Sequence, residues 1–276
     1  MPRTQITSDT APLYLQVDAT GEGRPVVLIH GWPLSGESWA PQVQALSPHY
    51  QVITYDRRGF GRSDKPETGY DYDTLAGDLH GVLEALDLHD VTLVGFSMGG
   101  GEVARYISRY GTDRIRSVVF AAAIPPYLLT TDDNPDGPLD EASADEAHDA
   151  LEQDRDGFLD EFTTMFFSTP DGTLTVTEQQ RQDALALARQ SDPTAALACQ
   201  TAFGTTDFRA DLEHVTVPTL ILHGDSDQAV PLDGSGARTH AAIPGSRLEV
   251  IEGAPHGLGV SHADEVNRIL LDFLAD

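Results

Sequence analysis

Short apolar runs recur along this chain with helical stretches between them, and this alternation restricts the fold more than any other feature. The runs are rich in aliphatic and β-branched residues, which is typical of strands buried on both faces of a sheet. The predicted strands cover residues 26–29, 52–55, 91–94, 118–120, 220–222 and 248–251, after an alternating, half-buried strand at residues 13–17. Apolar residues at helical spacing predict helices over 75–86 and 102–110. This pattern predicts an α/β fold with a mainly parallel, twisted sheet flanked by helices.

The alternation is interrupted in the second half of the chain. Residues 125–215 favour helices and contain no convincing buried strand, and the strand pattern then resumes at Thr219. We therefore interpret residues 125–215 as a helical cap inserted into a core formed by residues 1–124 and 216–276. An ordinary set of peripheral helices is the alternative interpretation.

The charge of the chain is strongly negative. It carries 44 acidic side chains against 17 basic ones, which gives a formal net charge of -27. Such a surface repels nucleic acids and anionic membranes, so neither is expected as a partner. Apolar periodicity through most of the sequence argues against an acidic disordered chain. We expect instead a halophilic protein, which should lose structure on dialysis to low salt and should not be fully stable in dilute buffer.

What the sequence lacks indicates its location and redox chemistry. No apolar run is long enough to span a bilayer, and residues 1–6 lack the apolar core of a secretory signal, so we expect a cytoplasmic protein. Cys199 is the only cysteine, which excludes an internal disulfide and a multi-cysteine metal site. No glycine-rich turn surrounds it, and we interpret it as a small apolar filler in a helix.

A glycine-flanked serine follows the strand at 91–94. Residues 95–99 read Gly-Phe-Ser-Met-Gly and precede a predicted helix. A G-x-S-x-G sequence between a strand and a helix is typical of a nucleophile elbow, in which a sharp turn lifts the serine hydroxyl clear of the sheet. The glycines let strand and helix approach closely, and the helix N-terminus places partial positive charge near a developing oxyanion. Ser97 is therefore predicted to be a nucleophile.

A serine hydroxyl needs a base to take its proton, and His256 is the best-placed candidate. It lies in a loop after the last predicted strand, at the sheet edge where Ser97 also emerges. An acid that orients the histidine is expected after the strand at 220–222, where Asp225 and Asp227 both occur. Asp227 stands further into the loop and is preferred. The resulting order of serine, aspartate and histidine is the one expected of α/β-hydrolases.

An oxyanion that forms at the nucleophile needs two backbone N–H donors. Met98, next to the nucleophile, is predicted to supply one, and Trp32, which follows an early strand, the other. Pro33 has no N–H and is expected to fix the loop conformation beside the substrate pocket. His30 is expected to help shape the same loop. Residues 55–63 are interpreted as a structural turn with an Asp–Arg network and no catalytic role.

Four segments of the chain together resemble one family. They are residues 30–34 (HGWPL), 55–63 (YDRRGFGRS), 95–106 (GFSMGGGEVARY) and 253–257 (GAPHG), and they closely resemble the cofactor-free haloperoxidases. These are perhydrolases related to arylesterases and γ-lactamases. The likeness covers nearly the whole chain and is weakest in the acidic part of the cap. It implies an α/β-hydrolase fold, a triad of Ser97, Asp227 and His256, oxyanion donors at Trp32 and Met98, and neither metal nor haem.

The resemblance also implies a reaction. A short carboxylic acid or ester acylates the serine, and hydrogen peroxide in place of water releases a peracid, which oxidises halide in solution. A proline after the oxyanion aromatic residue, here Pro33, is associated with perhydrolase behaviour, and family members are often trimers or larger, so a homo-oligomer is expected. Aromatic residues of the cap, Phe162 and Phe166 among them, are predicted to line the pocket and favour small apolar acyl groups.

The predicted function is therefore a serine hydrolase of small carboxylic esters or acids with perhydrolase activity. A carboxylesterase or γ-lactamase without perhydrolysis would use the same residues and is the main alternative, and carbon–carbon bond hydrolases fit the local motifs less well. Ser97 argues against haloalkane dehalogenases and epoxide hydrolases, which need a carboxylate at the elbow. A non-catalytic receptor on the same fold is the alternative from another class, and its Ser97 would not react with an organophosphonate.

Overall fold

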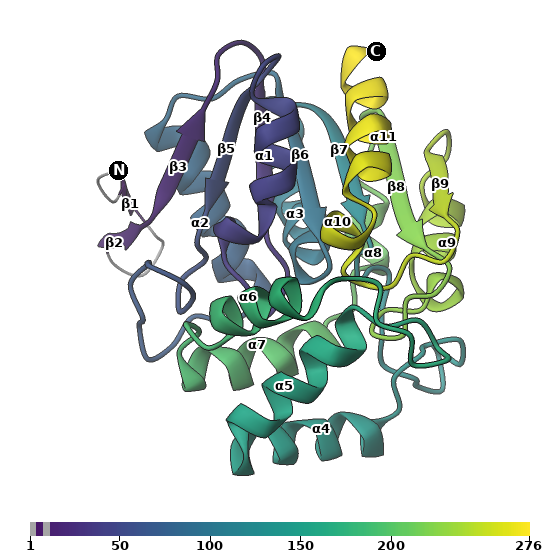
Figure 1. The fold of residues 1–276 in the computed structure, drawn as a ribbon. Helices are drawn as coiled ribbons and strands as arrows, with labels where there is room; N and C mark the ends of the chain where they lie inside the picture. Colours follow the sequence, from purple (N-terminus) through teal and green to yellow (C-terminus); the bar gives the residue numbers. More distant parts are fainter. Residues whose placement is uncertain (1–3, 8–11) are drawn as a thin grey trace.

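A computed structural model describes residues 4–7 and 12–276, which form two sheets and the helices around them (Figure 1). The strands are β1 (Thr4–Thr7), β2 (Pro12–Leu15), β3 (Val17–Thr20), β4 (Pro25–Ile29), β5 (Gln51–Tyr55), β6 (Val91–Phe96), β7 (Ile115–Ala121), β8 (Thr219–Gly224) and β9 (Arg247–Ile251). β1 and β2 pair as a small antiparallel sheet. The main sheet has the order β3-β5-β4-β6-β7-β8-β9. Its β3–β5 pair is antiparallel and its other pairs are parallel, so the predicted mainly parallel sheet is confirmed.

The first predicted strand, at residues 13–17, divides in two in the structure. Leu13 and Leu15 belong to β2, whereas Val17 begins β3. All three side chains are buried, as the alternating pattern predicted. Gln16 lies between the two strands and belongs to neither. Its backbone N–H donates to the side-chain oxygen of Ser63 at 2.9 Å instead of to a neighbouring strand. A side chain in a distant turn thus interrupts a strand that the local pattern favours.

Helices cover both faces of the main sheet (Figure 1). On one face α1 (Ala40–Leu46) contacts α11 (Ala263–Ala275), and on the other α2 (Tyr72–Ala85) contacts α3 (Met98–Tyr110). The remaining short elements are η1 (Gly36–Trp39), α8 (Arg209–Leu212), η2 (Leu232–Gly234), α9 (Gly236–Ala242) and α10 (Leu258–Ser261). Both predicted helices are present and begin earlier than expected, because local features initiate them. Asp71 caps α2 by accepting the N–H of Thr74 at 2.9 Å, and α3 begins directly after the serine turn.

Four longer helices lie between β7 and β8 in the chain. They are α4 (Glu141–Gln153), α5 (Arg155–Phe166), α6 (Glu178–Ala188) and α7 (Pro193–Thr205). Figure 1 shows them grouped below the ends of the parallel strands. Residues 125–215 are all described, and none of them belongs to either sheet. The division into core and cap domains at these positions stays a prediction. Within the described ranges, no helix is both long and apolar enough to cross a membrane.

Candidate active site

The turn between β6 and α3 holds Ser97 in a backbone conformation that few residues other than glycine adopt. Its φ is 54° and its ψ is -120°, and such a conformation is maintained only where the surrounding structure enforces it. A Cβ on Gly95 would lie 2.5 Å from the backbone oxygen of Gly99, and one on Gly99 would lie 2.6 Å from that of Ile29. The glycines of the G-x-S-x-G motif are therefore required by close backbone approach, and they leave Ser97 at the end of β6.

Three side chains predicted from separate motifs meet at this turn. The Ser97 hydroxyl lies 2.9 Å from Nε2 of His256, and Nδ1 of His256 lies 2.7 Å from a carboxylate oxygen of Asp227. Ser97 follows β6, Asp227 follows β8 and His256 follows β9, so the three come from one edge of the parallel sheet. All three are buried. The hydroxyl, imidazole and carboxylate thus form a continuous hydrogen-bonded chain.

The loop after β8 contains both aspartates that the sequence left in competition. Asp225 is exposed, and its carboxylate accepts the backbone N–H of Gly253 at 2.7 Å. Asp227 is the one that reaches the imidazole of His256. The Asp225 carboxylate therefore holds the backbone of the loop that carries His256, whereas Asp227 contacts His256 itself.

Asp227 is held in its ionised form. Burial by itself would raise the pKa of its carboxyl group, but the electrostatic interaction with His256 and the hydrogen bonds of His223 and His256 lower the pKa to about 2. Its other carboxylate oxygen accepts the backbone N–H groups of Ala229 at 2.9 Å and Val230 at 2.8 Å. An ionised Asp227 requires that Nδ1 of His256 carries the proton, which leaves Nε2 free to accept the proton of Ser97.

His223, near the end of β8, is a neighbour of the triad. It is fully buried, its Nε2 donates to the backbone oxygen of Val230 at 2.8 Å, and it lies 3.4 Å from the carboxylate of Asp227. A Cβ on Gly236 would lie 2.5 Å from its Nδ1. The side chain therefore braces the loop that presents Asp227. A histidine at the end of a strand next to a candidate acid is the signal that indicates this contact.

The oxyanion loop after β4 approaches the serine very closely. A Cβ on Gly31 would lie 2.7 Å from the ring of Phe96 and 3.0 Å from Cβ of Ser97. The next peptide bond carries the N–H of Trp32, and the first helical N–H after the serine belongs to Met98. Neither N–H has a backbone acceptor among the described residues. The first N–H groups of a helix have no partner within it, so this one is available to a ligand.

His30 orients the peptide group that carries the Trp32 N–H. Nδ1 of His30 donates to the carbonyl oxygen of Gly31 at 2.9 Å, and the N–H of Leu34 donates to the same oxygen at 3.0 Å. This carbonyl and the Trp32 N–H belong to one planar peptide unit and point in opposite directions. Nε2 of His30 accepts the backbone N–H of Arg57 at 3.0 Å, which fixes the tautomer. The expected role of His30 in shaping the loop thus has a specific geometry.

A buried ion pair connects this loop to the nucleophile helix. Arg57 donates to the backbone oxygen of His30 at 2.9 Å and to the carboxylate of Glu102, in α3, at 2.8 Å. Tyr55 also donates to Glu102. Burial, followed by the positive charge of Arg57, holds the pKa of His30 well below its ordinary value, so its imidazole is neutral.

The predicted Asp–Arg network in residues 55–63 is present, since Arg62 pairs with Asp56 at 2.8 Å. Sequence reasoning missed the pairing of Arg57 with Glu102. An acidic residue on the buried face of an otherwise apolar and glycine-rich helix is the signal that could have found it.

A cavity of about 520 Å³ opens onto the nucleophile. Ser97, His256 and Trp32 line its inner end, and the cap helices supply Phe158, Phe162 and Phe203. We call this space the catalytic cavity. Its inner wall is mainly apolar, with Ile124, Leu128, Leu139, Met165 and Val230 completing it. Phe162 therefore lies at the cavity next to Ser97, where it was predicted.

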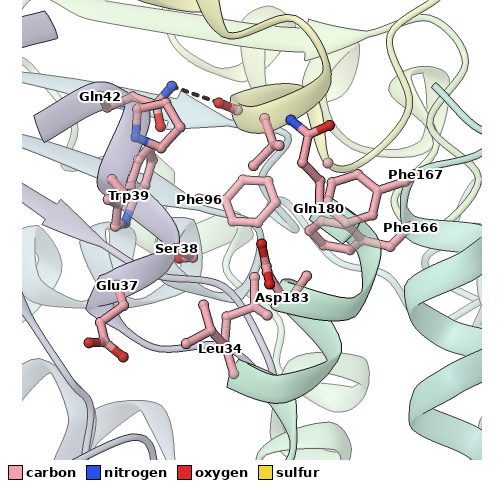
Figure 2. A pocket seen from close by; sticks show the side chains of 17 residues that line it. Leu34, Glu37, Ser38, Trp39, Gln42, Phe96, Phe166, Phe167, Gln180 and Asp183 are labelled. Atoms are coloured by element: carbon pink, nitrogen blue, oxygen red, sulfur yellow. Dashed lines mark hydrogen bonds between the residues drawn. The ribbon is translucent and has the colours of Figure 1, made fainter. Parts of the chain in front are cut away.

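Two other residues predicted at or beside the pocket, Phe166 and Pro33, are not among those that line the catalytic cavity. Phe166 lines a second cavity, of about 260 Å³, which Figure 2 shows between Trp39 and Gln42 on one side and Phe166 and Phe167 on the other. Its ring packs edge-on against His256 at 5.1 Å between centroids, and its backbone oxygen accepts the N–H of Gly257 at 2.8 Å. Phe166 therefore supports the back of the imidazole.

Pro33 is buried and is not among the residues that line the catalytic cavity. The reason is the tight turn described above, in which Leu34 hydrogen-bonds back to Gly31 and carries the chain away from the serine. Pro33 therefore lies next to Trp32, beside the catalytic cavity, and its role in fixing the loop there stays a prediction.

Cys199 is buried in α7, as expected for an apolar filler, and burial raises the pKa of its thiol to about 12. A search of the described part of the chain finds no group of three histidine, cysteine or acidic side chains that could hold a metal ion.

Comparison with known proteins agrees with the fold. Residues 24–263 match the family described as alpha/beta hydrolase fold, and the chain belongs to this family. Within the family it groups with the non-haem haloperoxidases. It is 44% identical to a non-heme chloroperoxidase from Kitasatospora aureofaciens, over 92% of this chain and 93% of the relative.

Two further relatives are similar over almost their whole length. A crystal structure of a bromoperoxidase from Bacillus anthracis is 54% identical and superimposes with a TM-score of 0.96, covering 99% of this chain and 100% of that one. A bifunctional esterase/perhydrolase from Acinetobacter calcoaceticus is 35% identical over 91% of both chains. The resemblance predicted from four sequence segments is thus confirmed at the level of the family.

Proposed function

We propose that this protein is a serine hydrolase that cleaves small carboxylic esters through an acyl-enzyme and passes the acyl group to water or hydrogen peroxide. The observation that carries the proposal is the hydrogen-bonded chain from Ser97 through His256 to Asp227, at the floor of an apolar cavity. The names of the relatives, haloperoxidases and an esterase/perhydrolase, support the same activity.

The first half-reaction follows from the protonation states. Nε2 of His256 takes the proton of Ser97 as the hydroxyl oxygen attacks the ester carbonyl, and ionised Asp227 stabilises the imidazolium. The carbonyl oxygen becomes an oxyanion, to which the N–H groups of Trp32 and Met98 donate hydrogen bonds, each contributing about 3 kcal/mol. The intermediate collapses when the bond to the alcohol breaks and the imidazolium returns its proton to the leaving oxygen.

The second half-reaction uses the same groups in the same order. His256 takes a proton from water or from hydrogen peroxide, whose oxygen attacks the acyl carbon and re-forms the oxyanion. Collapse releases Ser97 with its proton and gives a carboxylic acid from water or a peracid from peroxide. Halide oxidation then takes place in solution, where the peracid transfers an oxygen to the halide and becomes the acid.

Side-by-side assays test this proposal. We would measure hydrolysis and perhydrolysis of a short aryl ester in molar potassium chloride, with Ser97→Ala as the control. Hydrolysis that Ser97→Ala abolishes is the expected result, and wild-type activity in that variant would exclude the triad. Peracid formation that outpaces hydrolysis at modest peroxide would support the perhydrolase function. Hydrolysis with negligible peracid would instead favour the carboxylesterase or γ-lactamase alternative.

Several broader expectations belong to the same proposal. We propose that residues 125–215 act as the cap that selects the acyl group, and that the protein works in the cytoplasm as a homo-oligomer. The excess of 44 acidic over 17 basic residues supports a halophilic protein. Dialysis from molar salt to dilute buffer, followed by circular dichroism, tests this last point, because a halophilic fold loses structure as cations are removed.

A further inference from the structure

The outer end of the catalytic cavity carries an unusual balance of charge. Among the described residues that line it, Asp145 is the single carboxylate and none is lysine or arginine. Asp145 lies on α4 and is exposed, and its side chain forms no ion pair or hydrogen bond with any described residue. His148, three residues further along the same helix, also lines the cavity. An unpaired carboxylate thus stands at the entrance to the site.

Several other acidic side chains of the cap have partners. Asp140 accepts the N–H of Ser143 at the start of α4, at 2.9 Å. Glu178 and Asp160 both pair with Arg181, at 2.7 Å and 2.9 Å. These carboxylates stabilise helix ends or join helices, whereas no such structural role accounts for Asp145.

Aromatic rings line the same cavity as this carboxylate and the nucleophile. The indole of Trp32 is in edge contact with Phe162 at 5.1 Å, Phe203 at 5.7 Å and Phe158 at 6.2 Å between centroids. All four rings line the catalytic cavity and come from the oxyanion loop, α5 and α7. A cluster of aromatic faces attracts a cation, because each ring carries negative charge density above its plane.

These features favour one sign of ligand charge. A positive group in the cavity gains from the aromatic faces and from Asp145, while a carboxylate there meets an unpaired negative charge and no lysine or arginine. The net charge of -27 attracts cations and repels anions as they approach. We propose that the catalytic cavity selects esters by charge, and that it favours esters with a quaternary or protonated amine, with Asp145 as the residue that sets this preference.

This inference rests on the proposed ester hydrolysis and specifies its substrate class. The test compares acetylcholine with 3,3-dimethylbutyl acetate, an ester of the same shape in which carbon replaces the charged nitrogen. Acetic acid release gives kcat/KM for both, at the lowest salt that preserves the circular dichroism spectrum. The quotient of interest is kcat/KM for acetylcholine divided by kcat/KM for 3,3-dimethylbutyl acetate. Asp145→Asn is expected to lower this quotient about threefold, as for a single exposed charge near a cation. Asp149→Asn, on the same helix and outside the cavity lining, should leave the quotient unchanged.

The outcomes separate this inference from the proposed function. A quotient that is the same in Asp145→Asn as in the wild type would overturn the inference, and so would an equal fall in both variants, which would assign the effect to net charge. Hydrolysis of 4-nitrophenyl acetate, a neutral ester, is measured alongside. Its presence together with an unaltered quotient leaves the serine hydrolase intact, whereas its absence from the wild-type protein contradicts the proposed function itself.

Discussion

Helices α3 and α4 lie on opposite sides of the catalytic site and are held in very different ways. Most residues of α3 are buried, and it packs through bare glycine backbone, so that a Cβ on Gly100 would lie 2.3 Å from that of Ala123. In α4, all of whose residues the structure describes, Leu151 alone is buried. The core side of the site is fixed by close packing, while the cap side presents an acidic, solvent-facing helix.

This difference separates two tasks. Groups that must be placed accurately for proton transfer, such as Ser97 and His256, are attached to the packed sheet, where small displacements are costly. Groups that line the catalytic cavity from the cap, such as Phe162 and Asp145, come from helices with few buried side chains. Substitutions in the core should therefore affect every substrate alike, and substitutions in the cap should affect the choice among substrates.

The largest effect is expected at the acid of the triad. Asp227→Asn should lower kcat for ester hydrolysis about 10⁴-fold, because an amide cannot stabilise the imidazolium and favours the wrong tautomer of His256. Asp225→Asn is the matched control, since that carboxylate bonds the N–H of Gly253 instead. Its kcat should stay within about tenfold of the wild type. Equal losses in the two variants would contradict the assignment of Asp227 over Asp225.

Two glycines within helices compare the packing of core and cap directly. Gly100→Ala in α3 should lower the free energy of unfolding by about 2–3 kcal/mol, since neither backbone nor Ala123 can move aside cheaply. Gly204→Ala in α7 meets only the end of the Leu139 side chain, at 3.3 Å. It should leave stability unchanged or raise it by up to about 1 kcal/mol through helix propensity. Urea denaturation measures both, and similar losses would show that the cap is packed as tightly as the core.

The buried carboxylate of Asp227 should also make the free energy of unfolding depend on pH. Its pKa of about 2 in the folded protein lies below the ordinary value of about 3.9 for the unfolded chain. Asp227 therefore contributes up to about 2 kcal/mol of stability above pH ~4, and this contribution is lost as the pH falls from ~4 towards 2. The difference in unfolding free energy between wild type and Asp227→Asn, measured by urea denaturation, should narrow between pH 6 and pH 3. A difference that stays constant over this range would show that the pKa is not depressed.

The same contrast between core and cap explains which features the sequence predicted. The strands β4 to β9, Ser97, His256 and Asp227 were predicted from local patterns, because strand alternation and loops at strand ends fix their positions. The preference for Asp227 over Asp225 depended only on how far each residue stands into the loop. The structure agrees with that preference, because Asp227 contacts the imidazole of His256. The break between β2 and β3 was missed, since it depends on Ser63, a residue far away in the chain.

The pocket residues were harder to predict because they depend on packing between elements. Phe162 and Phe166 lie on one helix, α5, yet the first lines the catalytic cavity and the second lines the neighbouring one. Helical spacing alone does not determine which side faces the serine, since that depends on how the cap helices pack on the core. The pairing of Arg57 with Glu102 is a similar case, as it joins two core elements that are distant in sequence.

The smallest expected effects provide the sharpest comparison of core and cap. His30→Gln can still accept the N–H of Arg57 but cannot also donate to Gly31, so the oxyanion peptide is held less firmly. We expect kcat to fall about tenfold for acetate and hexanoate esters alike. Phe162→Leu should leave kcat for the acetate nearly unchanged and favour the hexanoate by about fivefold, because a smaller side chain enlarges the cavity. Initial rates on both esters measure the two variants. A change of preference in His30→Gln, or an equal loss on both esters in Phe162→Leu, would show that positioning and selection are not divided between core and cap.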